Sequence, residues 1–480
     1  MSELLNLKDK LGLLEKESRV LEINAQERSK LNSQVESLSN DFLDHLDSSN
    51  TYSTSRPKKA PFKITGDADE LEDILEVIDK EVFSHGLKAA SGGHLGYIPG
   101  GGLYASSLGD YIAAFSNEYA GMYFGSPGAV EVEEACLDWL KDLFEFPKES
   151  IGNLTSGGSI ANLIALTSAR DAKGVLDRPV AQSAIYMTEQ VHHCIHKALR
   201  IIGLAKVTVR TVDMDHVGRM SMDHLEKLIK SDKEEGLTPF LIIGSAGTTD
   251  MGAVDPLNDL SNLAVENNMW FHVDAAYGGF FKLLPEQKDK FKGIEKADSL
   301  VMDPHKSLFL PYGLGAVLVK DKEAVFQSHH YTANYMQDAT TGDVPISPAD
   351  VSPELTKHFR SLRMWLPLRL HGIKPFKAAL EEKIALTQYF REEIVKHGFE
   401  VGPEPDLSVT YFWYPKEKGE NEFNKELLRL CHEDGRVFLS STLIGDRFVF
   451  RMAILSFRTH RSTIDSAIDM LNRNVDKVRG

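Results

Sequence analysis

The sequence predicts an α/β protein in which a largely parallel sheet carries helices on both faces. Two observations predict this fold class. Between about residues 85 and 320, helical patterns such as GSIANLIALTSARDA alternate with short apolar runs such as PFLIIGSAG and MWFHVDAA, an order typical of strand–helix–strand units. Polar clusters, several of them glycine-rich, follow some of these runs, at the strand ends where such sheets bind ligands.

Two further segments flank this large domain, which we place at residues 85–365. Apolar residues at helical spacing, followed by a Ser/Thr/Pro-containing stretch, predict a helical segment and linker over residues 1–84. These first helices cannot form a core alone, so we expect them to pack on another domain or subunit. Helical patterns and the alternating run RVFLSSTLIGDRFVFRMAILS predict a small α+β domain over residues 366–480.

The composition excludes several classes of protein. The 480 residues include 54 Lys and Arg against 70 Asp and Glu, a net charge of −16 that disfavours nucleic acid as a partner. No apolar run reaches the length of a membrane span, and the N-terminus lacks the pattern of a signal peptide. The three cysteines are widely separated, which argues against a disulfide framework or structural zinc and favours the cytoplasm.

Lys306 raises the first chemical question, because it stands between two apolar segments in SLVMDPHKSLFLPYG. A buried ammonium group is costly unless it is paired or loses its charge. One interpretation is a lysine whose stem packs while its head reaches water. The other is a lysine that forms an imine with a carbonyl cofactor.

Asp274 follows another strand-like run, in FHVDAAYGG. It is either the cap of a turn or a carboxylate that keeps a pyridinium nitrogen protonated, so that the ring can accept electrons. The small residues Ala275 and Ala276 would let a flat ring lie close to it.

Gly157, Gly158 and Ser159 open a predicted helix and are either an ordinary cap or a binding site for a single phosphate. His192 and His196 lie four residues apart and would share a face of a helix. A metal site is disfavoured, because no HExxH pattern or third ligand accompanies them. The other use of His192 is an imidazole stacked on a cofactor ring and able to touch a substrate carboxylate.

These clusters together resemble a known family. Gly158-Ser159, His192, AGTTDMGAVDPL, HVDAAYGG and DPHKS occur in the order and spacing of the pyridoxal-5′-phosphate-dependent group II amino acid decarboxylases, and the resemblance covers about residues 18–475. It implies the fold of the PLP-dependent transferases, aspartate aminotransferase type I, with a mostly parallel seven-stranded sheet. It also implies pyridoxal 5′-phosphate (PLP) as the cofactor and a homodimer whose active sites lie at the interface, with the N-terminal helices interlocking the subunits.

The resemblance assigns roles to individual residues. Lys306 would hold the cofactor as an imine, Asp274 would face its ring nitrogen, and His192 would cover one face of the ring. Thr248 and His272 would help to orient the ring and the substrate carboxylate. The remaining cofactor contacts would come from Gly158, Ser159, Ala276, His305 and Ser307 or its neighbours.

The segment HHYTANYMQDATTGDVPIS resembles the family's mobile catalytic loop. Tyr331 has the spacing of the proton-donating tyrosine, and Tyr335 is the second candidate. In the family, phenylalanine at the donor position accompanies aldehyde formation, so a tyrosine favours simple decarboxylation to an amine and carbon dioxide.

The substrate remains the most open question. The resemblance places Tyr97, Ile98 and Pro99 in the side-chain pocket, and within SGGHLGYIPGGGLYASS only His94 offers a cation. An acidic side chain would need a positive partner there, so an aromatic L-amino acid is the predicted substrate. The alternatives are glutamate or aspartate with a cation from the partner subunit, an aldehyde-forming synthase, a carbon–carbon lyase, and a binding protein without cofactor.

Overall fold

The computed structural model describes residues 2–330 and 345–479 of the chain. The chain divides into two compact units, Met1–Lys88 and Ala89–Gly480. The first predicted boundary, after residue 84, lies close to this division. The second, after residue 365, falls within helix α12 (Leu362–His371) and stays a prediction.

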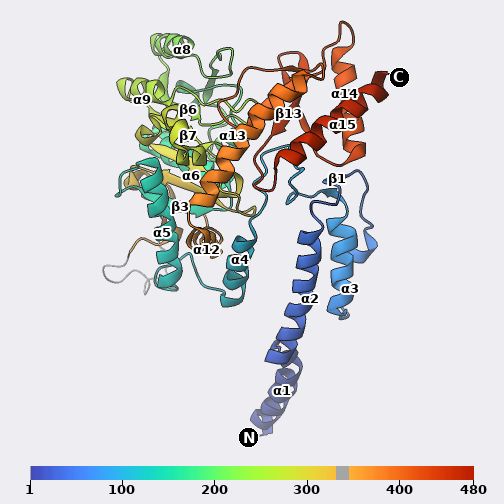
Figure 1. Ribbon diagram of the computed structural model, residues 1–480. Coiled ribbons are helices and arrows are strands. Elements are labelled where there is room, and N and C mark those ends of the chain that lie inside the picture. The colour runs from blue at the N-terminus through green and yellow to red at the C-terminus, as the bar shows by residue number, and fades with distance from the viewer. Residues whose placement is uncertain (1, 331–344, 480) are drawn as a thin grey trace. The chain divides into compact units, whose positions relative to one another are not determined.

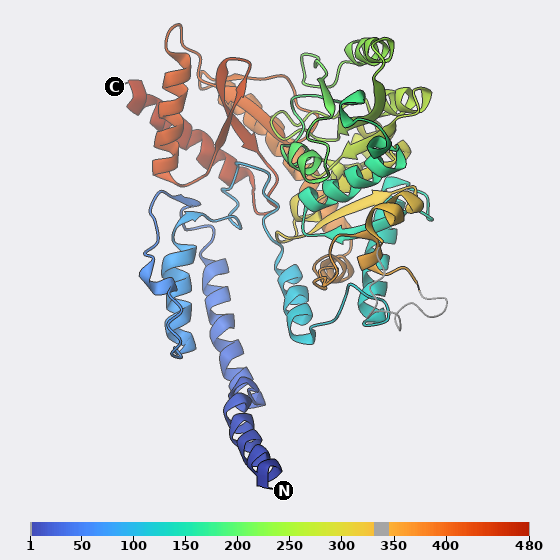
Figure 2. The ribbon, with the colours of Figure 1, turned by 180° about the vertical axis from the view of Figure 1, so that it is seen from behind.

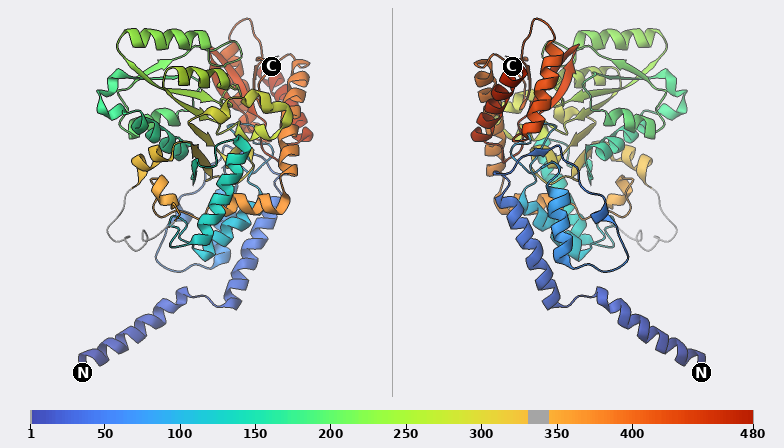
Figure 3. Two further views of the ribbon diagram at one scale, coloured as in Figure 1. Left: turned by 90° about the vertical axis from the view of Figure 1, so that its left-hand side faces the viewer. Right: turned by 90° about the vertical axis from the view of Figure 1, so that its right-hand side faces the viewer.

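The first unit is mostly helical, as predicted. Its elements are α1 (Ser2–Ser18), α2 (Ala25–Asp44), β1 (Tyr52–Ser53), α3 (Leu71–Val77) and β2 (Gly86–Leu87). A short break separates α1 from α2 (Figure 3). Asn24 begins α2 there, because its side chain accepts hydrogen bonds from the N–H groups of Gln26 and Glu27, and the Glu27 carboxylate accepts one from the Asn24 N–H.

The second unit is built on a seven-stranded sheet, which confirms the predicted sheet. The strand order is β3-β9-β8-β7-β6-β4-β5. Only β9 runs against the others, since it pairs antiparallel with both β3 and β8. The strands are β3 (Ile151–Thr155), β4 (Ser183–Met187), β5 (Thr208–Thr211), β6 (Thr238–Ser245), β7 (Trp270–Asp274), β8 (Ser299–Met302) and β9 (Gly315–Val319).

Helices cover both faces of this sheet (Figures 1 and 2). Alternate residues of one strand enter different cores: Leu241 and Ile243 pack with α6, α7 and α11, and Ile242 packs with α5, α8 and α9. Each such fully buried aliphatic side chain contributes about 1.5–3 kcal/mol. The helices of this part are α4 (Tyr104–Ser116), α5 (Pro127–Phe144), α6 (Gly158–Ala172), α7 (Cys194–Ile201), α8 (Met222–Glu234), α9 (Leu257–Glu266), α10 (Pro304–Ser307) and α11 (Lys322–His329).

The C-terminal part forms the predicted small α+β structure around an antiparallel sheet, in the order β10-β11-β13-β12. Helices α13, α14 and α15 lie against this sheet and share a core with it (Figure 1). The elements are α13 (Lys374–Val395), β10 (Glu400–Val401), β11 (Val409–Trp413), α14 (Glu420–Asp434), β12 (Ser440–Ile444), β13 (Arg447–Ala453) and α15 (Arg461–Arg479).

The edge strand β3 is covered by buried charges. Glu133 accepts a hydrogen bond from the Leu154 N–H at 3.0 Å, and Arg360 donates to the Leu154 carbonyl at 3.1 Å. Lys357 forms an ion pair with Glu133 and donates to Asn153 Oδ1 at 3.0 Å. These contacts satisfy edge groups of the strand that leads into α6. In residues 2–330 and 345–479, no helix is both long and apolar enough to cross a membrane.

Candidate active site

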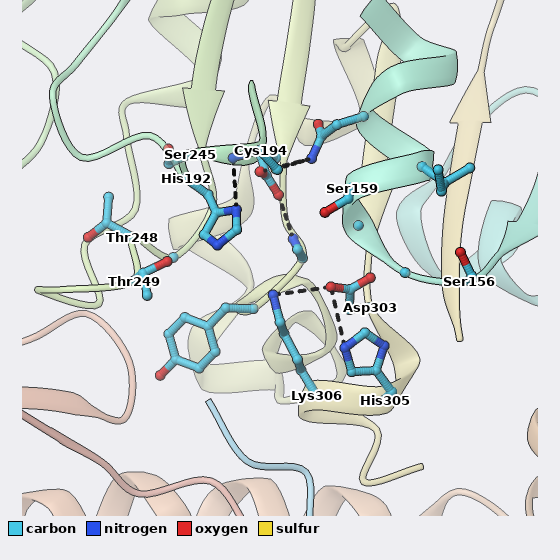
Figure 4. Close-up of a pocket in the computed structure, with 18 of the residues that line it drawn as sticks. Ser156, Ser159, His192, Cys194, Ser245, Thr248, Thr249, Asp303, His305 and Lys306 are labelled. Carbon is cyan, nitrogen blue, oxygen red and sulfur yellow. Dashed lines mark hydrogen bonds and ion pairs between the residues drawn. The ribbon is translucent and has the colours of Figure 1, made fainter. Parts of the chain in front are cut away.

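A cavity of about 400 Å³ lies at the carboxyl ends of the sheet strands (Figure 4). Residues that follow β3, β4, β6, β7 and β8 line it, because parallel strands deliver their carboxyl ends to one edge. Eight residues predicted from the sequence are brought together here: Gly158, Ser159, His192, Thr248, Asp274, Ala276, His305 and Lys306.

Lys306 lies in the short helix α10, directly after β8. Its Nζ atom lies 3.1 Å from Oδ2 of Asp303, which is almost fully buried (Figure 4). Burial alone would lower the pKa of Lys306, but the negative charges of Asp303 and Asp274 outweigh it, so the pKa is raised. Lys306 is therefore held as a paired ammonium group. The two interpretations drawn from the sequence, a head that reaches water and an imine with a cofactor, did not include this pair.

His305 lies on the other side of the same carboxylate. Its Nδ1–H donates to the Leu314 carbonyl at 2.6 Å, and its Nε2 lies 3.7 Å from Asp303 Oδ2. Burial lowers the pKa of His305, so the ring is neutral and its Nε2 carries a lone pair. Its edge meets the ring of Tyr312, another residue of the cavity wall, at 5.7 Å between centroids.

Asp274 is held by neutral donors. The Ala276 N–H donates to its Oδ1 at 3.0 Å, and the Asn162 side-chain amide donates to its Oδ2 at 3.2 Å. Because the amide nitrogen of Asn162 faces the carboxylate, its oxygen faces His272 and accepts from the Nε2–H of that ring at 2.8 Å. The orientation of Asp274 thus depends on a side chain of α6.

The same hydrogen-bond chain continues behind His272. The Ser299 hydroxyl donates to His272 Nδ1 at 2.8 Å and accepts from Trp270 Nε1 at 2.8 Å. Burial lowers the pKa of His272 to about 4, which keeps the ring neutral. His272 is fully buried and lies outside the cavity lining, so its predicted help in orienting the ring and the carboxylate would pass through Asn162, and this role stays a prediction.

His192 precedes α7 and points into the cavity (Figure 4). The Cys194 N–H donates to its Nδ1 at 3.3 Å, which places the proton of the neutral ring on Nε2. Burial, and then the charge of Lys306, lower the pKa of His192. Since His192 lies outside the helix while the exposed His196 lies within it, the two do not form the helical pair on which a metal site would depend.

The start of α6 lies at one end of the cavity. Gly157 has φ of +149°, and the first N–H groups of the helix have no acceptor within the helix. Gly158 and Ser159 line the cavity here, as predicted. Of the predicted contacts from Ser307 or its neighbours, the side chain of Ser307 is unavailable, because it is fully buried and donates to the Tyr277 carbonyl at 2.6 Å, while its neighbours His305 and Lys306 line the cavity.

The predicted substrate segment lies beside the lysine turn. A Cβ atom added at Gly100 would lie 2.2 Å from the His305 carbonyl oxygen, so the two backbones touch there. Ile98 packs in the main core, Tyr97 is 59% exposed with φ of +46°, and neither they nor Pro99 are among the described residues that line the cavity. Their role as substrate contacts stays a prediction. Burial lowers the pKa of His94 to about 4, so it is not the cation considered above.

Three important residues were missed by the sequence analysis. Asp303 had a signal, since it follows a buried strand directly, as Asp274 does. Asn162 had a weaker one, as a polar residue on an apolar face of α6. Arg451 had none: it comes from β13, is 3% exposed, and donates to the carbonyls of Thr249 and Tyr97 and to the Ser440 hydroxyl.

The lining of the cavity fits a flat cofactor with three functional groups. A helix start suits a phosphate, a lysine amine suits an aldehyde, and a carboxylate fixed by neutral donors suits a protonated ring nitrogen. PLP carries all three groups. Together with the strand order, this set defines a fold type I PLP-dependent enzyme.

Comparison with known proteins gives the family. The model of the pyridoxal-dependent decarboxylase conserved domain matches residues 54–415, and the chain belongs to this family, the group II decarboxylases. The protein is therefore a carboxy-lyase that uses PLP to decarboxylate an amino acid.

Similar proteins match most of the chain. Aromatic-L-amino-acid decarboxylase of Bacillus atrophaeus is 30% identical over 453 residues, which cover 92% of this chain and 94% of the relative. Phenylacetaldehyde synthase of Arabidopsis thaliana is 29% identical over 400 residues, covering 80% and 82%. The crystal structure of Oryza sativa TDC with PLP and tryptamine superposes with a TM-score of 0.90 at 23% identity, covering 95% of this chain and 99% of that chain, which shows the shared fold.

Proposed function

We propose that the protein converts an aromatic L-amino acid to the corresponding amine and carbon dioxide. The observation that carries the substrate class is the charge of the cavity wall. Among the described residues of this wall there is no arginine, and its one lysine, Lys306, is paired with Asp303. His192 and His305 have lowered pKa values and are neutral near pH 7. The wall thus offers no spare cation to an acidic side chain.

Arg451, a buried cation beside Tyr97, is the residue that would have to bind an acidic substrate instead. Its donors serve oxygen atoms of the protein: Nε the Thr249 carbonyl, Nη1 the Ser440 hydroxyl and Nη2 the Tyr97 carbonyl. Its Nε also lies 3.7 Å from Oδ1 of Asp250. An acidic substrate would have to displace one of these partners. The name of the Bacillus atrophaeus relative, an aromatic-L-amino-acid decarboxylase, supports the same substrate class.

Four parts of the cavity wall have distinct proposed roles. When bound, PLP supplies an aldehyde that amines attack and a ring that accepts the electrons of the Cα–carboxylate bond. Lys306 anchors the cofactor, and the start of α6, with Gly158 and Ser159, holds its phosphate. Asp274 stabilises the proton on the ring nitrogen, and His192, with its proton on Nε2, can donate to a substrate carboxylate.

The proton that replaces the carboxylate is assigned to Tyr331, with Tyr335 as the second candidate; both lie outside the described residues. Replacing the true donor with phenylalanine should slow amine release and produce aldehyde and ammonia in air. Comparing Tyr331→Phe with Tyr335→Phe by product analysis assigns the role. An aldehyde as the main product of the unaltered enzyme would favour the chemistry named for the Arabidopsis thaliana relative.

The substrate class is tested by specificity constants. We expect kcat/KM for tryptophan, tyrosine or phenylalanine to exceed the values for glutamate and aspartate by at least about a hundredfold, because an unpaired carboxylate in the cavity is costly. A preference for either acidic substrate would overturn the proposal and point to a cation from a partner subunit.

We also propose a homodimer. Five large apolar residues of α4 form one stripe and are 37–66% exposed: Tyr104, Leu108, Tyr111, Ile112 and Phe115. Exposed apolar stripes of this kind mark interaction surfaces. Because the family resemblance implies a homodimer, we take a second copy of this chain as the partner. Phe115→Asp should shift the mass measured by light scattering from dimer to monomer, whereas Val265→Asp, at an isolated exposed position on α9, should not.

The three buried free cysteines support our proposal of a reducing, cytoplasmic location.

A further inference from the structure

We propose that Asp303 is a positioning residue that holds the Lys306 amine whenever this amine is not bonded to the cofactor, and that exchanges one proton with it. This inference rests on the proposed role of Lys306 as the cofactor-binding lysine. The geometry points to it directly: Lys306 Nζ lies 3.1 Å from Asp303 Oδ2, within one turn of the chain. The second carboxylate, Asp274, instead accepts hydrogen bonds from Asn162 and Ala276.

The fold makes room for this one carboxylate. A Cβ atom added at Gly158 would lie 2.9 Å from Asp303 Oδ2, and one added at Gly315 would lie 2.7 Å from Oδ1. Two glycines, at the start of α6 and the start of β9, therefore border both oxygens. A side chain at either position would push the carboxylate away from Lys306.

Asp303 has no competing donor among the described residues. Its Oδ1 is buried and has no hydrogen-bond partner there. His305 Nε2 lies 3.7 Å from Oδ2, but its ring is neutral and its one proton, on Nδ1, serves the Leu314 carbonyl. A buried carboxylate is costly without a partner, and Lys306 is the partner that the chain supplies.

Other titratable groups also face the lysine and set its charge. They are Asp274, His192, Cys194, His305 and Tyr312, in addition to Asp303. Of these, Asp303 is the group with an ion pair to Nζ, and its removal should change the protonation of Lys306 most.

The proton balance is simple. Only a neutral amine has a lone pair with which to attack a carbonyl carbon. The ammonium of Lys306 gives one proton to Oδ2 of Asp303, leaving a neutral amine and a neutral carboxylic acid. When the amine is released again, the same proton returns. No oxidant, reductant or further reactant is needed.

The test measures the protonation of Lys306 without relying on activity. The full chain is stripped of PLP with hydroxylamine and dialysed, and brief acetic anhydride labelling between pH 6.5 and 10.5 is followed by mass spectrometry. Lys306 in the unaltered protein should reach half-maximal labelling at a higher pH than the exposed Lys148. In Asp303→Asn, the labelling rate of Lys306 at pH 8 should rise by roughly tenfold or more, since an adjacent opposite charge shifts a pKa by at least one unit.

The matched control is Asp274→Asn, which removes a charge from the same cavity but no contact with Lys306. Its effect on the labelling rate should be smaller than that of Asp303→Asn. The inference is overturned by an equal or larger effect of the control, or by an unchanged profile in Asp303→Asn. If Asp303→Asn does not fold, the unaltered protein decides: labelling of Lys306 at a lower pH than Lys148 would show a buried amine without its ion pair. Borohydride reduction of the holoenzyme separately tests the anchor, because a PLP adduct on another lysine would contradict only the proposed function.

Discussion

Asp274 ends β7 and Asp303 directly follows the neighbouring strand β8, yet the surroundings of the two carboxylates differ in kind. Asp274 accepts from a side-chain amide and a backbone N–H, and a neutral hydrogen-bond chain runs behind it through His272 to Trp270. Asp303 has an ammonium group on one oxygen and no partner among the described residues on the other. The first carboxylate is held in place by neutral donors, whereas the second faces an ammonium group, with which we propose that it exchanges a proton.

The largest expected effect comes from removing the partner of Asp303. Lys306→Ala should lower amine production by at least about a thousandfold, because the anchor and the proton carrier are lost together. After borohydride reduction, mass spectrometry should find no PLP adduct. Lys320→Ala, at a partly buried lysine outside the cavity lining, should retain both. A reduced adduct that persists in Lys306→Ala would contradict the assignment.

Asp274→Asn tests the fixed carboxylate. The new amide brings a donor to a place where the amide of Asn162 and the N–H of Ala276 already donate. We expect kcat to fall by roughly a hundredfold or more, as for other lost electrostatic contacts, while PLP still binds and absorbs in the visible range. Near-native turnover at full cofactor content would show that the charge of Asp274 is not needed.

Asn162→Ala separates the carboxylate from the chain behind it. Asp274 Oδ2 and His272 Nε2 would both lose a partner, which should cost about 1–3 kcal/mol of stability and lower kcat by about tenfold. The control is Asn474→Ala, at another fully buried asparagine, in α15. It should lower the unfolding midpoint but leave kcat unchanged. Equal kcat values in the two variants would show that Asn162 contributes to stability but not to turnover.

The smallest effect concerns acid stability. Burial lowers the pKa of His272 from 6.5 to about 4, so the unfolded chain binds a proton that the folded protein does not. Stability should therefore fall as the pH drops from 6.5 to 4, by about 3 kcal/mol at most from this residue. In His272→Gln, urea unfolding should show a weaker dependence on pH in this range. Part should remain, since His94 also has a pKa lowered to about 4 by burial. An unchanged dependence would contradict a neutral His272.

The sheet and the central residues of the site could be predicted because their signals are local. Buried parallel strands are continuous apolar runs, and polar residues such as Lys306 and Asp274 interrupt the apolar pattern where those runs end. The alternation of side chains along β7 also indicates where His272 lies. Trp270, His272 and Asp274 share one face of β7, so His272 had to lie beneath the carboxylate, away from the ligand.

The rest depends on segments that are distant in sequence. The space around Asp303 is set by Gly158 and Gly315, and the contact of Gly100 with the lysine turn joins positions about 200 residues apart. Arg451 reaches Tyr97 from the C-terminal sheet. The periodicity of the sequence does not predict such contacts, because each residue follows only the pattern of its own helix, strand or turn.

The covered edge of β3 has a consequence for solubility and handling. An exposed strand edge presents free N–H and carbonyl groups to which another chain can add a strand, and this is a common start of aggregation. Here Glu133 and Arg360 occupy the N–H and carbonyl of Leu154, and the charge of Lys357 is buried beside them. A strand that approached this edge would have to separate buried ion pairs. These contacts therefore hinder another chain from adding a strand at the β3 edge of the sheet.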